Sequence, residues 1–229
     1  MDGGDTCQRT GFVESILRFR DYFGISNEEF FTASGWSFQD AWPTLLTPQG
    51  QKLIRNPRPG DSIPAWNDPS DTSRDQTDPM IIAFGLNHMR GQVDLIRPKM
   101  QWYGLYKYQN ADIAAPSHLS TIDRALGLEP LLIGDLWANL AIRHWCREAS
   151  KDLDNVGDDL NYLLHAVFCY VVKPTKISKA TLKYYLQNRP HNLGTNWVME
   201  KYNVEDNVLA ALMWYFRESS GGNPDIAHL

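Results

Sequence analysis

The chain has 229 residues, 43% of them hydrophobic, and a formal net charge of −5. This composition excludes fibrous and disordered proteins and fits one large or two small globular domains with a real core. No apolar run approaches the roughly 20 residues that span a bilayer, and the polar start "MDGGDTCQRTG" lacks the pattern of a secretory signal, so we expect no membrane insertion.

The charge imbalance lies entirely in the first third of the chain. Residues 1–80 hold 12 acidic and 7 basic side chains, whereas residues 81–229 hold 15 of each. Because no basic stripe is available to neutralise a phosphate backbone, the sequence argues against nucleic acid as a partner. The cysteines (Cys7, Cys146 and Cys169) show no CxxC spacing, so we expect reduced thiols. The histidines show no metal-ligand spacing and no nucleotide-binding loop is present, so we expect neither a metal nor a cofactor.

Residues 1–35 are expected to form N-terminal helices. The segment "GFVESILRFRDYFG" places apolar residues at helical spacing and ends at Gly24. Ser26 and Glu29 have the spacing of a capping box, which predicts a second helix start.

Residues 36–78 form a long segment rich in proline, which we call the arm. It contains six prolines and three tryptophans, Trp36, Trp42 and Trp66, and only "TPQGQKLIR" has the composition of a short helix. Because a segment this long without regular structure is unusual in a compact domain, we expect the arm to pack against the helical body or against neighbouring subunits.

Residues 79–229 are predicted to be regularly helical, giving an all-α fold of antiparallel helix hairpins with six or seven helices. "PMIIAFGLNHMRG" is predicted as one helix, and "PSHLSTIDRALG" as another that begins at Ser117 and ends at Gly127. In the next two helices, helical periodicity predicts the apolar faces. These are Leu132, Ile133, Leu136, Trp137, Leu140, Ala141 and Trp145 in the first, and Leu160, Leu163, Leu164, Val167, Phe168, Val171 and Val172 in the second.

The acidic stretch "DPSDTSRDQTDPM" precedes the first of these helices. Asp78 followed by Pro79 is typical of an N-cap and first helical position, and Ser73 with Gln76 also fits a capping box. Capping leaves Asp71, Arg74 and Asp75 unexplained, so these three are either a structural ion-pair cluster or part of a polar cleft.

Other acidic residues also stand at helix starts. Asp159 lies in the first turn of the "GDDLNYLL" helix, where the helix dipole favours a carboxylate. Asn110 and Asp112 lead into the helix that begins near Ser117. Asp135 interrupts an apolar run, and we expect it at the edge of the apolar face. If it faced inward, desolvation would raise its pKa, as a general acid requires.

Five segments together resemble a loosely defined group of uncharacterised proteins encoded in tailed-phage genomes, often near virion genes. They are "DTSRDQTDP", "YQNADIAAPSHL", "VGDDLNYLLHAV", "KPTKISKATLKYYL" and "WYFRESSGGNPDIAHL", and they extend over roughly residues 68–229. The resemblance implies a virion structural protein, associated with the tail or neck, made in the host cytoplasm and packed as a homo-oligomer against other virion proteins.

The helix hairpins with acidic starts also resemble part of the (α/α) toroid of glycoside hydrolases and lyases, which implies a glycan as substrate. Under that alternative the candidate catalytic residues are Asp75, Asp135 and Asp159, with binding residues Asp71, Trp66, Arg74, Asn110 and Asp112. Asp75 and Asp159, with Asp112 nearby, are then expected at one end of the helical body. A third alternative is a non-catalytic module that binds a cell-surface glycan through exposed tryptophans.

Overall fold

The computed structural model describes residues 6–23, 37–47, 52–55, 72–101, 104–109, 112–148 and 156–188. The described residues form an all-α fold, as the sequence predicts. The helices are α1 (Thr6–Phe23), α2 (Phe38–Ala41), α3 (Arg74–Leu86), α4 (Arg90–Ile96), α5 (Pro116–Ala125), α6 (Leu132–Glu148), α7 (Val156–Val171) and α8 (Lys176–Asn188), with a 3-10 turn η2 (Trp42–Leu45). None of the described helices is both long enough and apolar enough to cross a membrane.

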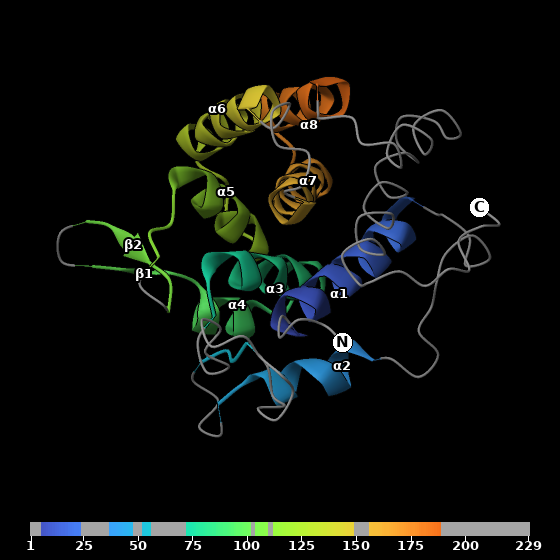
Figure 1. The fold of residues 1–229 in the computed structure, drawn as a ribbon, viewed down its shortest axis with the longest axis vertical. Helices are drawn as coiled ribbons and strands as arrows, with labels where there is room; N and C mark the ends of the chain where they lie inside the picture. The colour runs from blue at the N-terminus through green and yellow to red at the C-terminus, as the bar shows by residue number, and fades with distance from the viewer. Residues whose placement is uncertain are drawn as a thin grey trace.

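Helix α3 is the centre of the structure. It packs against α1, α4, α5 and α7, which surround it in Figure 1. Its residues from Met80 to Phe84 are all buried, as expected for a helix that is apolar on every side. Because α3 lies among these four helices, the position of its first turn decides which of its polar side chains face the interior of the molecule.

Helices α5 to α8 form the second part of the structure. Helix α5 packs against α6, and α8 packs against both α6 and α7. Helix α7 buries Leu163, Leu164, Val167 and Phe168, which confirms the predicted apolar face among its described side chains. Helix α5 ends before Gly127, whose φ of +75° is a left-handed conformation that glycine adopts at low cost.

Helix α6 is oriented differently from the prediction. Leu132, Ile133, Leu136, Trp137 and Leu140, which periodicity placed in the core, are exposed. The residues that face the interior are instead Gly134, Asp135, Ala138, Ile142 and Cys146. The predicted apolar face of α6 is therefore wrong at these five positions, which present large apolar side chains outward. Trp145, at the far end of the predicted face, does pack against the core.

The single helix predicted from Pro79 to Gly91 is also wrong, because the chain breaks it into α3 and α4. His88, between the two, has a φ of 57°. Asn87 caps α3 and donates from Nδ2 to the buried carboxylate of Glu14 at 2.6 Å. A short two-stranded sheet follows, in which β1 (Lys99–Met100) pairs antiparallel with β2 (Tyr106–Lys107).

The described part of the arm lies against the helical body. The Phe38 and Trp42 rings each contact the Phe84 ring of α3, at centroid distances of 5.6 and 5.5 Å. The Leu53 amide donates a hydrogen bond to Gln109 Oε1, and the Leu53 carbonyl oxygen accepts one from Gln109 Nε2. These contacts agree with the expectation that the arm packs on the body, while Trp36 and Trp66 lie outside the described residues.

Candidate active site

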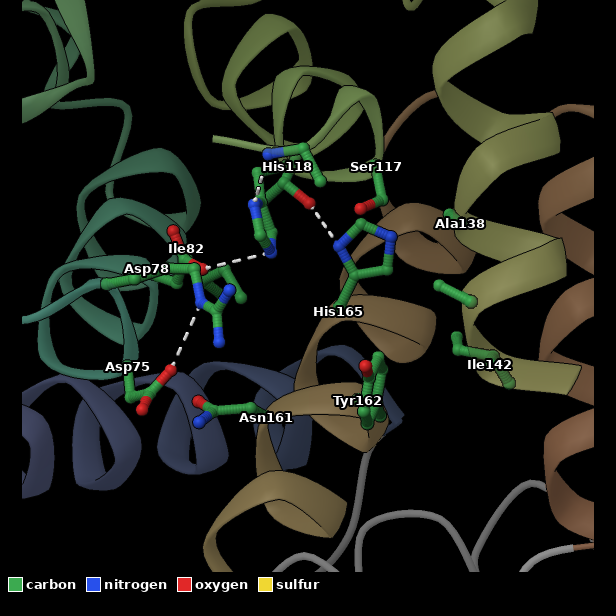
Figure 2. Close-up of a pocket in the computed structure, with 14 residues that line it drawn as sticks. Asp75, Asp78, Ile82, Ser117, His118, Ala138, Ile142, Asn161, Tyr162 and His165 are labelled. Atoms are coloured by element: carbon green, nitrogen blue, oxygen red, sulfur yellow. Dashed lines mark hydrogen bonds and ion pairs between the residues drawn. The ribbon is translucent and has the colours of Figure 1, made fainter. Parts of the chain in front are cut away.

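A pocket of about 180 Å³ lies between the first half of α3 and helices α5, α6 and α7. Figure 2 shows the carboxylates of α3 on one side and His165, Asn161 and Tyr162 of α7 on the other. The lining combines charged and polar side chains with a few apolar ones: Arg74, Asp75, Asp78, Ile82, Ala115, Ser117, His118, Thr121, Ala138, Ala141, Ile142, Asn161, Tyr162 and His165.

The start of α3 brings its carboxylates into this pocket. Helix α3 begins at Arg74 with Ser73 as N-cap, and Gln76 Oε1 accepts a hydrogen bond from the Ser73 amide at 3.1 Å. The predicted capping box is therefore confirmed, whereas the prediction of Asp78 as N-cap and Pro79 as first helical residue is wrong. With the helix starting one turn earlier, Asp75 and Asp78 are spaced i, i+3 and lie on the same face.

Asp78 is the most perturbed carboxyl group in the pocket. Burial raises its pKa to about 7, although the hydrogen bond from Tyr108 and the charge of Arg74 act in the opposite direction. Tyr108 Oη donates to Oδ1, and His118 Nε2 lies 3.7 Å from Oδ2. The Asp78 side chain keeps 21% of its surface exposed, so it is desolvated yet still reachable from the pocket.

His118 is held in one tautomer beside Asp78. Its Nδ1 accepts a hydrogen bond from the Ala115 amide at 3.1 Å, so the proton of the neutral ring is on Nε2, which faces Asp78. Burial, with a contribution from Arg74, lowers the pKa of His118 to about 4. Around neutral pH the ring is therefore an uncharged donor that can hydrogen-bond to the Asp78 carboxyl group.

His165 forms the rear of the pocket together with Thr121. Its Nδ1 contacts the Thr121 hydroxyl, and its Nε2 lies 3.9 Å from the Cys169 sulfur. Burial lowers the pKa of His165 to about 3 and raises that of the Cys169 thiol to about 11. His165 is therefore a partly buried histidine with a neighbour at each ring nitrogen. Cys169 is a protonated thiol in the core and has none of the features of an activated nucleophile.

Arg74, Asn161 and Tyr162 are further polar groups of the pocket. Arg74 Nε lies 3.3 Å from Asp75 Oδ1, and both side chains are less than half exposed. Asn161 Oδ1 is buried and accepts no hydrogen bond from the described residues. Tyr162 stacks on Trp145 with ring centroids 5.5 Å apart. Because a buried acceptor is costly when it lacks a donor, Asn161 is suited to bind a ligand hydroxyl or amide.

Asp135, a predicted catalytic residue, lies outside this pocket. It is buried between α5, α6 and the start of α8, where both of its oxygens accept hydrogen bonds from the Arg124 guanidinium at 2.7 and 2.9 Å. Burial alone would raise its pKa, but the bonds from Arg124, Ser120 and Thr175 lower it instead. The expected position of Asp135 at the edge of the apolar face is wrong, and so is the rise in pKa that was expected if it faced inward.

The other predicted site residues divide into two groups. Asp112 Oδ2 accepts a hydrogen bond from the Arg74 amide at 3.1 Å, so it stabilises the start of α3 next to the pocket. Asp159 belongs to the first turn of α7, but its side chain is outside the described residues, as are Asp71, Asn110 and Trp66. Among the described residues, no group of three or more histidine, cysteine or acidic side chains is arranged to hold a metal ion.

Sequence reasoning missed Asp78, His118 and Tyr162 as pocket residues. The i, i+3 spacing of Asp75 and Asp78 was visible, but it became informative only with the helix start placed at Ser73. No sequence pattern marked His118 as a pocket residue. Its place in the pocket depends on its contact with Asp78, which Tyr108 also binds, and Asp78 is distant in sequence.

Comparisons with known proteins add no family to this description. No protein-family model matches the chain, and no curated protein or solved structure matches it either.

Proposed function

We propose that the pocket is the active site of a glycan hydrolase in which Asp78 is the proton donor. The observation that carries this proposal is a carboxyl group with a pKa of about 7, one helical turn from a second carboxylate in the same pocket. Glycoside hydrolysis needs such a pair, because one group protonates the leaving oxygen while the other acts as an anion.

The spacing of the two carboxylates fits this chemistry. Side chains at i, i+3 on a helix have Cβ atoms about 5–6 Å apart, and the carboxyl groups of glycosidases are about 5–10 Å apart. Asp78 transfers its proton to the glycosidic oxygen as the bond to the anomeric carbon breaks. Asp75, paired with Arg74, stabilises the positive charge that develops on the sugar ring. A water molecule then adds its hydroxyl group to the anomeric carbon, and the proton that the water releases returns to the Asp78 carboxylate.

Neighbouring side chains position the donor and the substrate. The Tyr108 hydroxyl donates a hydrogen bond to one oxygen of the Asp78 carboxyl group, and the His118 ring lies 3.7 Å from the other oxygen. Asn161 Oδ1 offers an acceptor for a sugar hydroxyl, and Tyr162, supported by Trp145, offers an aromatic surface at the pocket wall.

The test is release of reducing ends from peptidoglycan and capsular polysaccharides by the full-length chain. We expect turnover by the wild type and a loss of about 10²–10⁴-fold in kcat/KM for Asp78→Asn, the range for removal of an acid–base catalyst. Asp94→Asn is the matched control, because Asp94 is an exposed carboxylate paired with Arg97 on α4, and it should keep full activity. kcat/KM should fall as the pH rises past about 7, where Asp78 loses its proton.

Three results would contradict the hydrolase. One is the absence of cleavage by the wild type across the panel. Another is an Asp78→Asn variant as active as Asp94→Asn. The third is an unsaturated sugar product, which indicates a lyase. Binding without cleavage would support the glycan-binding module instead.

A second proposal follows from the resemblance to phage-encoded proteins. We propose that a virion structural protein, associated with the tail or neck, remains the leading non-enzymatic function. The exposed apolar face of α6 favours it, since large exposed apolar patches mark contacts with other proteins. Mass spectrometry of purified virions checks it: the chain should be present in stoichiometric amounts, and its absence from virions would rule this function out.

A further inference from the structure

The pocket narrows from an exposed mouth to a buried rear. Arg74 and Asp75, at the start of α3, have side chains that are 43% and 44% exposed, whereas that of Asp78, one turn later, is 21% exposed. Further inside, the lining residues Thr121 of α5 and Ile142 of α6 are buried. A ligand therefore enters past Arg74 and Asp75, and Asp78 lies between the mouth and the interior.

The pocket has room for one sugar ring. Its volume is about 180 Å³, and a protein cavity of about 150 Å³ binds a single benzene ring. One six-membered sugar ring with its hydroxyl groups therefore fills the interior, and a second linked ring has to lie outside the mouth. A site that cuts within a polymer needs room for sugar rings on both sides of the cleaved bond.

The walls of the interior are polar or apolar but uncharged. Figure 2 shows Ala138 and Ile142 of α6 facing His165 and Tyr162 of α7 across the pocket. Burial lowers the pKa of His165 to about 3, so its ring is neutral around neutral pH. The ring of His118 is neutral for the same reason, because burial lowers its pKa to about 4. Such walls suit the hydroxyl groups and carbon atoms of a sugar.

The permanent positive charge of the pocket lies at its mouth. Of the described lining residues, Arg74 is the one that carries such a charge, and its Nε lies 3.3 Å from Asp75 Oδ1. A carboxylate or sulfate on the enclosed ring would be buried without a counter-charge, which is strongly unfavourable. Asn161 Oδ1, a buried acceptor that receives no hydrogen bond from the described residues, instead needs a donor such as a sugar hydroxyl.

We propose that the pocket takes the uncharged sugar at the non-reducing end of a glycan and releases it as a monosaccharide. This inference rests on the proposed hydrolase, because Asp75 and Asp78 define where the glycosidic bond lies. Asp75 lines the pocket, so the ring that develops positive charge, and that carries the anomeric carbon, is the enclosed one. That ring has no room for another sugar on its non-reducing side. The rest of the glycan leaves through the mouth as the alcohol that Asp78 protonates, and water supplies the new hydroxyl group of the released sugar.

The first experiment compares release from the chain end with internal cleavage. The full-length chain is given neutral oligosaccharides with a fluorescent label at the reducing end, and nitrophenyl glycosides of neutral sugars and of glucuronic acid in both anomers. We expect labelled products shortened by one sugar at a time. We also expect kcat/KM for glucuronides to be at least about a hundredfold lower than for the best neutral glycoside. Release of longer fragments from the start, or glucuronides cleaved as fast as neutral glycosides, would overturn the proposal and leave the hydrolase intact.

The second experiment measures binding without cleavage, so it separates this inference from the hydrolase. Calorimetric titration of the Asp78→Asn variant with methyl glycosides should show one site per chain for a neutral sugar and none for the glucuronide. Adding Asn161→Leu should weaken binding at least about tenfold, because the enclosed sugar loses a buried acceptor. The matched control is Asn188→Leu, at an exposed position that ends α8, and it should bind like its parent.

The outcomes of the two experiments are distinct. Neutral sugars that bind but are never cleaved by the wild type would refute the hydrolase and the release step, and would keep the pocket as a site for an uncharged chain end. No binding, equal binding of the glucuronide, or an Asn161→Leu variant that binds as tightly as Asn188→Leu would overturn the assignment of the pocket itself.

Discussion

Two aspartates of this protein show that the partners of a carboxyl group, more than its depth, decide its chemistry. Asp135 is 1% exposed, yet its pKa is lowered, because Arg124 binds both of its oxygens and the Ser120 and Thr175 hydroxyls donate to it. The Asp78 side chain is more exposed than that of Asp135, yet burial raises its pKa to about 7. The Tyr108 hydroxyl and the partly exposed Arg74 act against this rise but do not cancel it. Asp135 is therefore a structural anion, and Asp78 is the group that we propose as the proton donor.

The raised pKa of Asp78 predicts a pH-dependent effect of Asp78→Asn on stability. The folded state holds the Asp78 proton up to about pH 7, whereas the unfolded chain loses it near its usual value of about 4. Stability from this group is therefore complete below about pH 4 and is lost as the pH rises through about 7. Asparagine can still accept the Tyr108 hydrogen bond, so the variant should gain on the wild type across this window by a few kcal/mol at most.

Urea unfolding of both proteins at pH 4.5 and pH 8 measures this difference. The pKa values of His118 and His165 are lowered, so both residues reduce the stability of the fold as the pH falls. Both histidines are present in the two proteins, so their effects cancel in the comparison. Asp94→Asn is the control. Its hydrogen bond to Arg97 lowers the pKa of Asp94, so its difference from the wild type should stay flat between these pH values. The same flat result for Asp78→Asn would be inconsistent with a buried, protonated carboxyl group.

At this scale the sequence predicted which residues were polar and near a helix start, but it could not predict their partners. Asp75 was predicted as a site residue and does line the pocket. Asp78 was assigned to capping because Asp followed by Pro is a common helix start, but Ser73, five residues earlier, is the N-cap instead. The partner of Asp135, Arg124, comes from another helix, and no spacing rule relates the two.

At the scale of elements, α6 shows why periodicity predicts a helix more securely than the face it buries. The side of α6 that meets α5 carries small residues, since a methyl group at Gly134 would lie 2.9 Å from the Pro116 carbonyl oxygen. Close approach lets Asp135 reach Arg124 and leaves the leucines on the opposite side. The period of α6 was visible in the sequence, but the choice of the buried face depended on the ion pair between Asp135 and Arg124.

A similar close approach joins α1 to α3, and it predicts the effect of Gly11→Ala. A methyl group at Gly11 would lie 2.5 Å from the Pro79 carbonyl carbon and 2.7 Å from the Met80 nitrogen. Alanine is normally the better helix former by roughly 0.5–1 kcal/mol, but here the two backbones must separate. We expect Gly11→Ala to destabilise the fold by about 1–3 kcal/mol, the usual cost of overpacking.

The matched control is Gly91→Ala in α4, because an added methyl group there meets nothing within 4 Å. It should be neutral or slightly stabilising in the same chemical unfolding measurement. If both variants gained stability, the contact between Gly11 and Pro79 would not be as close as the structure has it.

At the scale of the whole molecule, the described helices share one hydrophobic core. Phe12 of α1, Phe38 and Leu45 of the arm, Phe84 of α3 and Leu163 of α7 belong to the same buried cluster. The sequence divided the chain into residues 1–35, 36–78 and 79–229 by changes in composition, and each of these segments contributes to that cluster. Composition could identify an all-α chain with an arm, but the contacts that join the segments are long-range and leave no local pattern.

The shared core predicts that a truncation in the arm destabilises the entire fold. Phe38 is 4% exposed and its ring contacts Phe84, so Phe38→Ala should cost about 3–5 kcal/mol, the usual range for deleting a buried aromatic ring. Because the cavity opens against α3, the helical signal near 222 nm and tryptophan fluorescence should both shift to a lower urea midpoint and still coincide. Leu105→Ala, at an exposed position, should leave that midpoint unchanged. An early fluorescence transition with an unmoved helical transition would instead mean that the arm unfolds separately from the body, and that its contacts with α3 add little to the stability of the helices.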